Sequence, residues 1–398
     1  MKPLLCTIML SMLLSACGSD GGIQEVTAPT ISKSQYTLFT PLASKDTYLV
    51  NEDGDTVHTW SSNYRPGLST YLLENGELLH TGSNGVIEIL DWESNVIWTQ
   101  TISAQNDDIQ YQAHHDVSVL PNGNILALVQ ETISADEAEA LGRITLSEDT
   151  LKADAVYEIC RSSESNDCTD GEIVWQWSVW DHIVQDTDSS ISATYVTDVS
   201  EHTDKIDINY YHRDKSDWTH GNGIDYNVDT DQIIISLRNF SEYWVLDHSD
   251  ASSGIVYRNG NPAAYGGAGE RTLYFQHDAH WIAEGTPGAG NILIFNNGLD
   301  RPEGNYSSVD EYCDSDDCEQ GALIKNYSEG VSGEFYADHI SGSQRLSNGH
   351  TLVCEGTEGR LFEYDENDNI VWELEYGASI FRAYRYDEDY TGLSRLAE

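Results

Sequence analysis

The chain has 398 residues, with 67 acidic against 20 basic side chains and a formal net charge of −47. A charge of this sign repels phosphate backbones and anionic lipid headgroups, so nucleic-acid binding is excluded as the main function. Hydrophobic residues make up 39% of the chain, enough for a sizeable core, and the 10 Trp and 23 Tyr beside 32 Gly favour an all-β protein with many turns.

The N-terminus has the pattern of an export signal. Residues 1–16 combine a positively charged start, an apolar stretch and small residues directly before Cys17. This arrangement resembles the bacterial lipobox, in which the cysteine is lipidated and begins the mature chain; ordinary cleavage to a soluble protein is the alternative. Gly18 follows where an inner-membrane retention signal usually has Asp, so we expect an outer-membrane lipoprotein facing the periplasm or the exterior. Residues 17–33 then form a flexible tether and residues 34–398 a single domain.

Tight hairpin turns recur along the chain. Asn-Gly pairs between apolar runs favour such turns because both central residues tolerate positive φ. Clear examples lie in 73–79, 120–126 and 346–352, and less regular ones in 229–234 and 288–293. Each is followed by a second hairpin whose return strand often carries tryptophan: 47–60, 87–98, 156–177, 243–257, 309–327 and 361–372.

This repeat predicts a six-bladed β-propeller. Six second hairpins and five first hairpins make six four-stranded units, one of them split between the chain ends. Strands near 35–40 and 380–386 supply the missing pair, so both termini close the first blade. Isolated sheet repeats cannot bury both faces, and ring closure solves that problem. A β-sandwich is the alternative.

Five cysteines remain after Cys17. Cys160 with Cys168, and Cys313 with Cys318, form close pairs inside second hairpins, and in an exported chain such pairs predict disulfides. Zinc is not expected, since neither pair has the companion cysteines or histidines of a zinc site. Cys354 is predicted to be a buried free thiol.

Histidines stand at the entrance to the first strand of several units. They are His114 and His115, His220, His277 and His339. In a propeller these positions are the mouths of the innermost strands, so the side chains should converge on the central funnel. Asn222 and Arg238 join them, and such donors suit an anionic ligand.

These motifs resemble the bacterial arylsulfate sulfotransferases. The likeness rests on His114-His115-Asp116, on 219–226 with 236–239, on Gln276-His277-Asp278 and on 381–385, and it spans roughly 35 to 390. It implies a six-bladed propeller that moves a sulfuryl group from an aryl sulfate to a phenol without a phosphosulfate nucleotide.

The resemblance also implies roles. His277 is the nucleophile and becomes transiently sulfated; His220, Asn222 and Arg238 hold the sulfuryl oxygens; His114 or His115 assists. His339 is a further substrate-binding candidate. No metal or other cofactor is needed, because sulfuryl transfer, like phosphoryl transfer, depends mainly on positioning and charge stabilisation.

Two other classes of function fit the same residues. A propeller lyase or metal-dependent hydrolase would use the histidines as metal ligands, with Asp116, Asp278 and Asp338 as neighbouring carboxylates. A non-catalytic propeller would only hold an anionic ligand. Metal analysis of the purified protein distinguishes the metal-dependent class from a sulfotransferase. Turnover of a chromogenic aryl sulfate distinguishes a sulfotransferase from a non-catalytic propeller.

Overall fold

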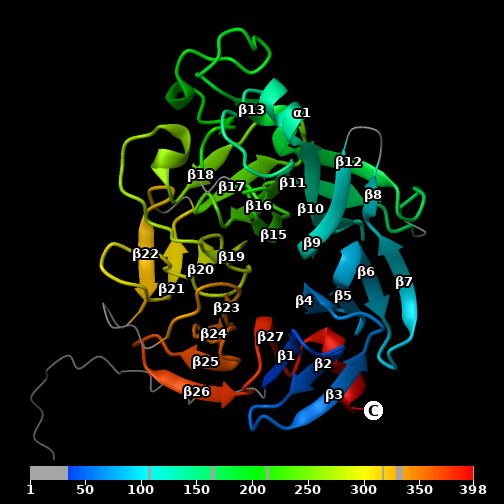
Figure 1. Cartoon of the computed structure of the whole chain (residues 1–398). Helices are drawn as coiled ribbons and strands as arrows, with labels where there is room; N and C mark the ends of the chain where they lie inside the picture. The colour runs from blue at the N-terminus through cyan, green and yellow to red at the C-terminus, as the bar shows by residue number, and fades with distance from the viewer. Residues whose placement is uncertain are drawn as a thin grey trace, which may run out of the picture. The chain divides into compact units, whose positions relative to one another are not determined.

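A computed structural model describes residues 35–105, 109–162, 166–211, 215–315, 318–328 and 335–397. The predicted signal, the tether and Cys17 lie outside the described residues. Residues 34–398 form one compact unit. Within it the described chain is almost entirely β-structure, and its sheets follow one another around a common centre in a propeller-like arrangement (Figure 1).

Four separate four-stranded antiparallel sheets are present among the described residues. Their strands, from the innermost outward, are β27 (Ile380–Asp387), β1 (Gln35–Pro41), β2 (Asp46–Val50) and β3 (Thr56–Ser61); β15 (Gly221–Asn227), β16 (Gln232–Leu237), β17 (Glu242–Asp247) and β18 (Tyr257–Asn259); β19 (His277–Trp281), β20 (Ile292–Asn296), β21 (Ser308–Tyr312) and β22 (Leu323–Tyr327); β23 (Gly342–Arg345), β24 (Thr351–Glu355), β25 (Arg360–Tyr364) and β26 (Ile370–Glu375).

The remaining large sheet corrects the prediction of six separate units. It has nine strands: β4 (Pro66–Leu72), β5 (Leu78–Gly82), β6 (Val86–Leu90), β7 (Val96–Thr101), β8 (Ser103–Gln105), β9 (Gln110–Val119), β10 (Ile125–Ser134), β11 (Thr150–Ile159) and β12 (Ile173–Ser178). Two antiparallel runs, β4 to β7 and β9 to β12, join through one parallel pairing of Leu68 with His115. The sequence could not show this contact, because it depends on how closely two inner strands approach.

The hairpins themselves form as predicted. All six second hairpins pair, from β2 with β3 to β25 with β26. Gly76, Gly123 and Gly349 take φ of 83°, 89° and 90°, as the Asn-Gly turns require. The predicted closure by the two chain ends is also confirmed, since β1 pairs with β27 from Gln35 opposite Asp387 to Pro41 opposite Ile380.

Few elements lie outside the large sheets. They are the short helix α1 (Ala135–Ala140), the parallel pair β13 (Ile183–Val184) and β14 (Ile206–Asp207), and 3-10 turns at Ser83–Gly85, Val179–His182, Val199–Glu201, Pro262–Tyr265 and Thr391–Ala397. Helix α1 begins at a capping box in which Ser134 and Glu137 satisfy each other's backbone N–H groups. No helix in the described ranges is long and apolar enough to cross a membrane.

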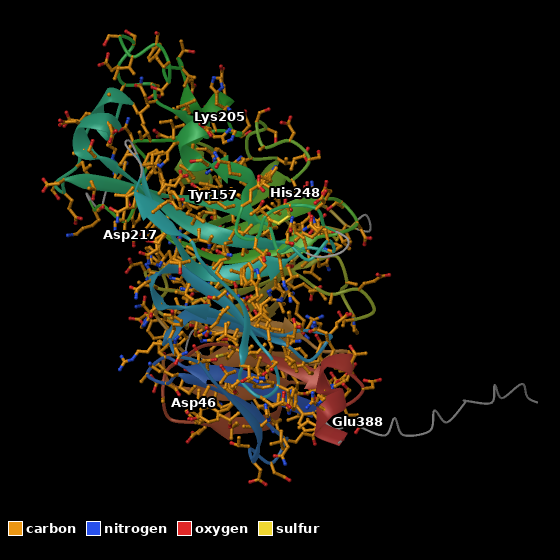
Figure 2. All side chains as sticks on the ribbon, turned by 90° about the vertical axis from the view of Figure 1, so that its right-hand side faces the viewer. Asp46, Tyr157, Lys205, Asp217, His248 and Glu388 are labelled. Carbon is orange, nitrogen blue, oxygen red and sulfur yellow. A yellow bond between two sulfur atoms is a disulfide. The ribbon has the colours of Figure 1, made fainter. Side chains whose placement is uncertain are left out.

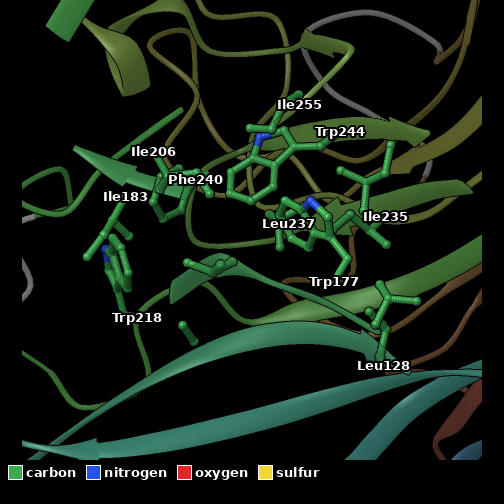
Figure 3. Packing of buried hydrophobic residues seen from close by; sticks show 14 of the residues in the cluster. Leu128, Trp177, Ile183, Ile206, Trp218, Ile235, Leu237, Phe240, Trp244 and Ile255 are labelled. Atoms are coloured by element: carbon green, nitrogen blue, oxygen red, sulfur yellow. The ribbon is translucent and has the colours of Figure 1, made fainter. Parts of the chain in front are cut away.

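Apolar side chains fill the space between neighbouring sheets. In the cluster of Figure 3, Trp177 of β12 packs with Trp244 of β17, and Phe240 lies between Trp218 and Trp244. Burying a side chain of this size contributes about 1.5–3 kcal/mol or more, so such contacts hold adjacent sheets in fixed positions. The strand ends at the centre are therefore rigidly placed.

Both predicted disulfides are present. Cys160 bonds Cys168 after β11, and Cys313 bonds Cys318 after β21. Each closes a short loop on a second hairpin and contributes about 2–3 kcal/mol. Cys354 is buried and free, and burial raises the pKa of its thiol. Two disulfides agree with an exported protein.

Candidate active site

The innermost strands β4, β9, β15, β19, β23 and β27 surround the centre (Figure 1). A residue in the left-handed region stands in or just before four of these strands, near the histidines: His115 has φ 57°, His220 56°, Asp278 59° and Ile340 50°. This conformation costs free energy, especially for a β-branched residue, and it is concentrated at functional sites. The strained positions mark the histidine end of the axis as the candidate active site.

His277, the first residue of β19, is held at both ring nitrogens. It is 2% exposed, its Nδ1 lies 2.7 Å from Asn297 Oδ1, and its Nε2 accepts from the Ile340 N–H at 3.2 Å. The Asn297 amide donates to the Ala337 and Ile340 carbonyls at 2.8 and 3.0 Å, so its oxygen faces His277. Nδ1 therefore carries the proton, and Nε2 carries the lone pair.

The surroundings also keep this imidazole neutral. Burial and then the positive charge of Arg238 hold the pKa of His277 well below its ordinary value. The pKa of His115 is also well below its ordinary value, because of burial and the neighbouring His114 and His220. A nucleophile needs this neutral form, and so the protonation state of His277 fits the predicted role.

The neighbouring residues His114 and His115 point in different directions. His115 faces the candidate site: its ring centroid lies 5.0 Å from that of His220 and 6.0 Å from that of Phe381, which in turn lies 6.4 Å from His277. His114 points away and pairs through Nε2 with the buried Asp154 at 2.8 Å, while its Nδ1 lies 2.6 Å from that of His115. His115 is therefore the one of the two that faces the site.

His220 is paired with a carboxylate. Its Nδ1 lies 2.6 Å from Asp217 Oδ2, which leaves Nε2 for a substrate. Burial alone would raise the pKa of Asp217, but the hydrogen bond and charge of His220 outweigh burial and lower it. A carboxylate that holds one imidazole nitrogen stabilises the protonated ring, so this pair can carry a proton.

Arg238 lies at the edge of the site. Its guanidinium stacks over Phe275 at 5.0 Å from the ring centroid, and Nη2 donates to the Asp338 carbonyl at 3.4 Å. His339 is exposed and pairs with the Asp338 carboxylate at 2.5 Å. His339 thus stands at an exposed position between the residues that contact Arg238 and His277, and its role in substrate binding stays a prediction.

Asn222, which the resemblance assigns to the sulfuryl oxygens, is engaged within the protein. The side chain is fully buried, and its Nδ2 donates to the Gln276 carbonyl at 2.8 Å. The amide thus fixes β15 against the residue before His277 instead of presenting a free donor. A sequence pattern cannot distinguish these two uses of an asparagine.

Arg382 of β27 connects the strands that carry the histidines. It pairs with Asp116 at 2.7 Å and with Asp278 at 3.1 Å, and Nη2 donates to the Asn222 carbonyl at 3.0 Å. Asp116 follows His115 and Asp278 follows His277, so one buried guanidinium fixes both strands. The sequence did not predict this role, although Arg382 lies in 381–385, one of the motifs that resemble the family.

The same contacts bear on the metal-dependent alternative. Asp116 and Asp278 are buried and engaged with Arg382, and Asp338 is half exposed beside His339. In the described part of the chain, no group of three or more His, Cys, Asp or Glu side chains is placed to hold a metal ion.

The opposite end of the axis contains a cavity of about 690 Å³. Its lining comes from the far ends of the inner strands, including Tyr226 of β15, Trp281 of β19 and Tyr384 of β27, with Arg382 and Asp278 forming its inner boundary. The side view separates the two ends: Asp217, the partner of His220, lies on one side and His248, in the sheet of β15 to β18 beyond the β15–β16 turn, on the other (Figure 2). The histidine end and the cavity end are thus distinct regions.

Fold and site together define a propeller-like protein with a buried, neutral histidine beside an arginine. The family model for arylsulfotransferase (ASST) matches residues 71–377, and the chain belongs to this family. No curated protein matches the chain.

Several solved structures are similar to this chain at low identity. A protein of unknown function from Bacteroides caccae is 12% identical with a TM-score of 0.50, covering 89% of this chain and 99% of that one. A putative 6-phosphogluconolactonase from Bacteroides fragilis is 10% identical with a TM-score of 0.47, covering 90% and 100%. A virginiamycin B lyase from Staphylococcus aureus is 8% identical with a TM-score of 0.43, covering 85% and 84%.

Proposed function

We propose that the protein transfers a sulfuryl group from an aryl sulfate to a phenol through a sulfohistidine at His277. The observation that carries this proposal is the fixed tautomer of His277. Asn297 accepts from Nδ1, so the Nε2 lone pair points to the Ile340 N–H, next to the charge of Arg238. Membership of the arylsulfotransferase family supports the sulfotransferase class.

In the first half-reaction, Nε2 attacks sulfur and the S–O bond to the aryl group breaks. The bonding electron pair leaves with the aryl oxygen, which takes a proton from His220 held by Asp217. The Ile340 N–H, now on Nε2, must give way to sulfur and would then donate to a sulfuryl oxygen. Arg238 supplies a planar pair of donors for the remaining negative charge.

In the second half-reaction, a phenol loses its proton to His220 and its oxygen attacks sulfur. The S–Nε2 bond breaks, and the electron pair returns to Nε2. His115 stays neutral and adjoins the His220 ring, where it can accept a hydrogen bond from the acceptor. Asn297 accepts from Nδ1 throughout, so the ring keeps its orientation.

The same proposal covers the architecture and the location of the protein. We propose that the nine-stranded sheet acts as two blades, β4 to β7 and β9 to β12, which makes six blades in all. We also propose export as a lipoprotein anchored through Cys17 to the outer membrane, with small aryl sulfates and phenols as the only partners required.

The direct test is turnover of a chromogenic aryl sulfate with a phenol acceptor. The wild-type protein should show ping-pong kinetics and a rate unchanged by chelators, and His277→Asn should have no measurable turnover. His202→Asn is the matched control, because His202 follows the 3-10 turn Val199–Glu201, outside the inner strands, and it should keep the wild-type rate. Normal turnover by His277→Asn, or a chelator-sensitive rate restored by metal, would overturn the proposal in favour of the metal-dependent class.

A further inference from the structure

The cavity at the end of the axis opposite the histidines has no part in the proposed reaction. Its volume, about 690 Å³, is within the range of small-molecule sites. It opens to solvent beside Val228, which is 63% exposed, and it ends inside at Arg382. A built, open cavity of this size can admit a ligand of its own.

The walls of this cavity are rich in aromatic rings. Tyr71, Tyr226, Trp281, Tyr384 and Tyr386 line it together with aliphatic side chains. The faces of such rings carry partial negative charge, and rings grouped around a pocket bind substituted ammonium ions by cation–π attraction. The walls therefore favour an apolar ligand and, among charged ligands, a cation.

The charged groups in the lining also favour a cationic ligand. Each arginine there is already neutralised: Arg345 pairs with Glu311 at 2.7 Å, and Arg382 with its two aspartates. His280 lies 3.6 Å from Asp278 Oδ1. The positive groups are therefore not available to an anionic ligand.

Three further carboxylates line the cavity. Asp225 accepts from the Trp281 backbone N–H at 3.1 Å, and Asp229 and Glu284 are exposed. His280 interacts electrostatically with Asp225. Among the described residues, Asp229 and Glu284 take part in no ion pair, so these carboxylates leave the cavity with an excess of negative charge. Of the three, Asp225 lies deepest, next to the aromatic walls.

We propose that this cavity binds an organic cation, a substituted ammonium ion on an aromatic or aliphatic body, with Asp225 as its counter-charge and the tyrosine and tryptophan rings around it. The ligand differs in sign from the aryl sulfates of the proposed function. Binding here needs no turnover, so the two proposals can fail independently.

The test measures binding by titration calorimetry with three probes: benzyltrimethylammonium, its neutral isostere neopentylbenzene, and phenyl sulfate. The wild-type protein should bind the cation at least tenfold more tightly than the neutral isostere, and phenyl sulfate should not displace it. Asp225→Asn should weaken the cation about tenfold and leave the neutral isostere unchanged. Asp338→Asn, which removes a carboxylate at the histidine end, is the matched control and should bind the cation like the wild type.

Glu284→Gln provides a second variant at an exposed position where folding is not at risk, and it should weaken the cation about twofold to threefold. Equal affinity for the cation and its neutral isostere in the wild-type protein would overturn the proposal, as would wild-type affinity in Asp225→Asn or displacement by phenyl sulfate. The wild-type comparison of probes decides the matter even if Asp225→Asn does not fold.

Discussion

Strand β19 carries two histidines, His277 at its start and His280 near its end, whose pKa values are shifted in opposite directions. At His277, burial and the charge of Arg238 lower the pKa. At His280, burial also favours the neutral form, but the carboxylates of Asp278 and Asp225 outweigh it and raise the pKa. The neutral ring of His277 thus suits a nucleophile at one end of the axis, whereas His280 lies among carboxylates that favour its charged form at the other end.

The difference arises from a dividing layer between the two ends, formed by Arg382 with Asp116 and Asp278. Arg382 forms ion pairs with Asp116 and Asp278, so these carboxylates are not available to His277. Asp278 nevertheless remains close to His280. A single buried cation therefore separates an electropositive site from an acidic cavity. Substitutions at one end of the axis should therefore leave the other end unchanged.

The largest effect is expected from Arg382→Met, which removes the dividing layer. Two buried carboxylates would lose their partner, and breaking a buried pair in this way costs about 3–5 kcal/mol. Urea unfolding should show that loss in the free energy of unfolding. Adding Asp116→Asn and Asp278→Asn to Arg382→Met removes the unpaired charges and should recover part of it. A loss below about 1 kcal/mol for Arg382→Met would mean that the layer does not hold the two ends together.

Arg238→Lys acts on the histidine end alone. Lysine keeps the charge but loses the planar fork and the stacking on Phe275, so kcat/KM should fall about a hundredfold, or ~3 kcal/mol. Arg271 also stacks on Phe275, at 5.0 Å, but bonds the Leu273 carbonyl, so Arg271→Lys is the matched control and should cost much less activity. Equal losses in the two variants would contradict the role of Arg238.

The pH profile tests the same residue in another way. A neighbouring cation lowers the pKa of His277, so Arg238→Gln removes that cause and raises the pKa. Because activity needs the neutral ring, the acid limb of kcat/KM should move to higher pH in Arg238→Gln. If the acid limb of kcat/KM does not move, the pKa of a group other than His277 controls activity at low pH.

The smallest effect is expected at the cavity end. Burial raises the pKa of Asp225 to about 6, and above this pH its carboxylate helps to raise the pKa of His280. Asp225→Asn should therefore lower the pKa of His280 and leave that of His277 unchanged, as followed by NMR titration of the histidine rings. A shift of both pKa values would show that the two ends are not electrostatically separate.

The hairpins, and the strand starts at which His220 and His277 stand, were predictable from the sequence because they depend on local signals. Asn122-Gly123 specifies a turn whatever surrounds it, and His220 and His277 stand at strand starts that the turns define. The nine-stranded sheet was not predictable, since Leu68 and His115 meet only when the inner strands close around the centre.

The long-range contacts that position the site residues could not be predicted from the sequence either. Arg382 and Asp116 are 266 positions apart, and the turn that supplies the Ile340 N–H to His277 is 63 positions away. Such contacts follow from ring closure rather than from any local pattern. The cavity depends on how six strand ends fill the axis, which is a matter of side-chain volumes in three dimensions.

The most direct test of the account is to look for the sulfated histidine itself. The protein is incubated with an aryl sulfate donor and no acceptor, digested at alkaline pH, and the peptide that contains Gln276-His277-Asp278 is analysed by mass spectrometry. We expect one sulfuryl group on His277, absent from His277→Asn and removed when a phenol is added. A sulfuryl group on another residue, or release of the phenol from the donor with no modified peptide at all, would contradict it.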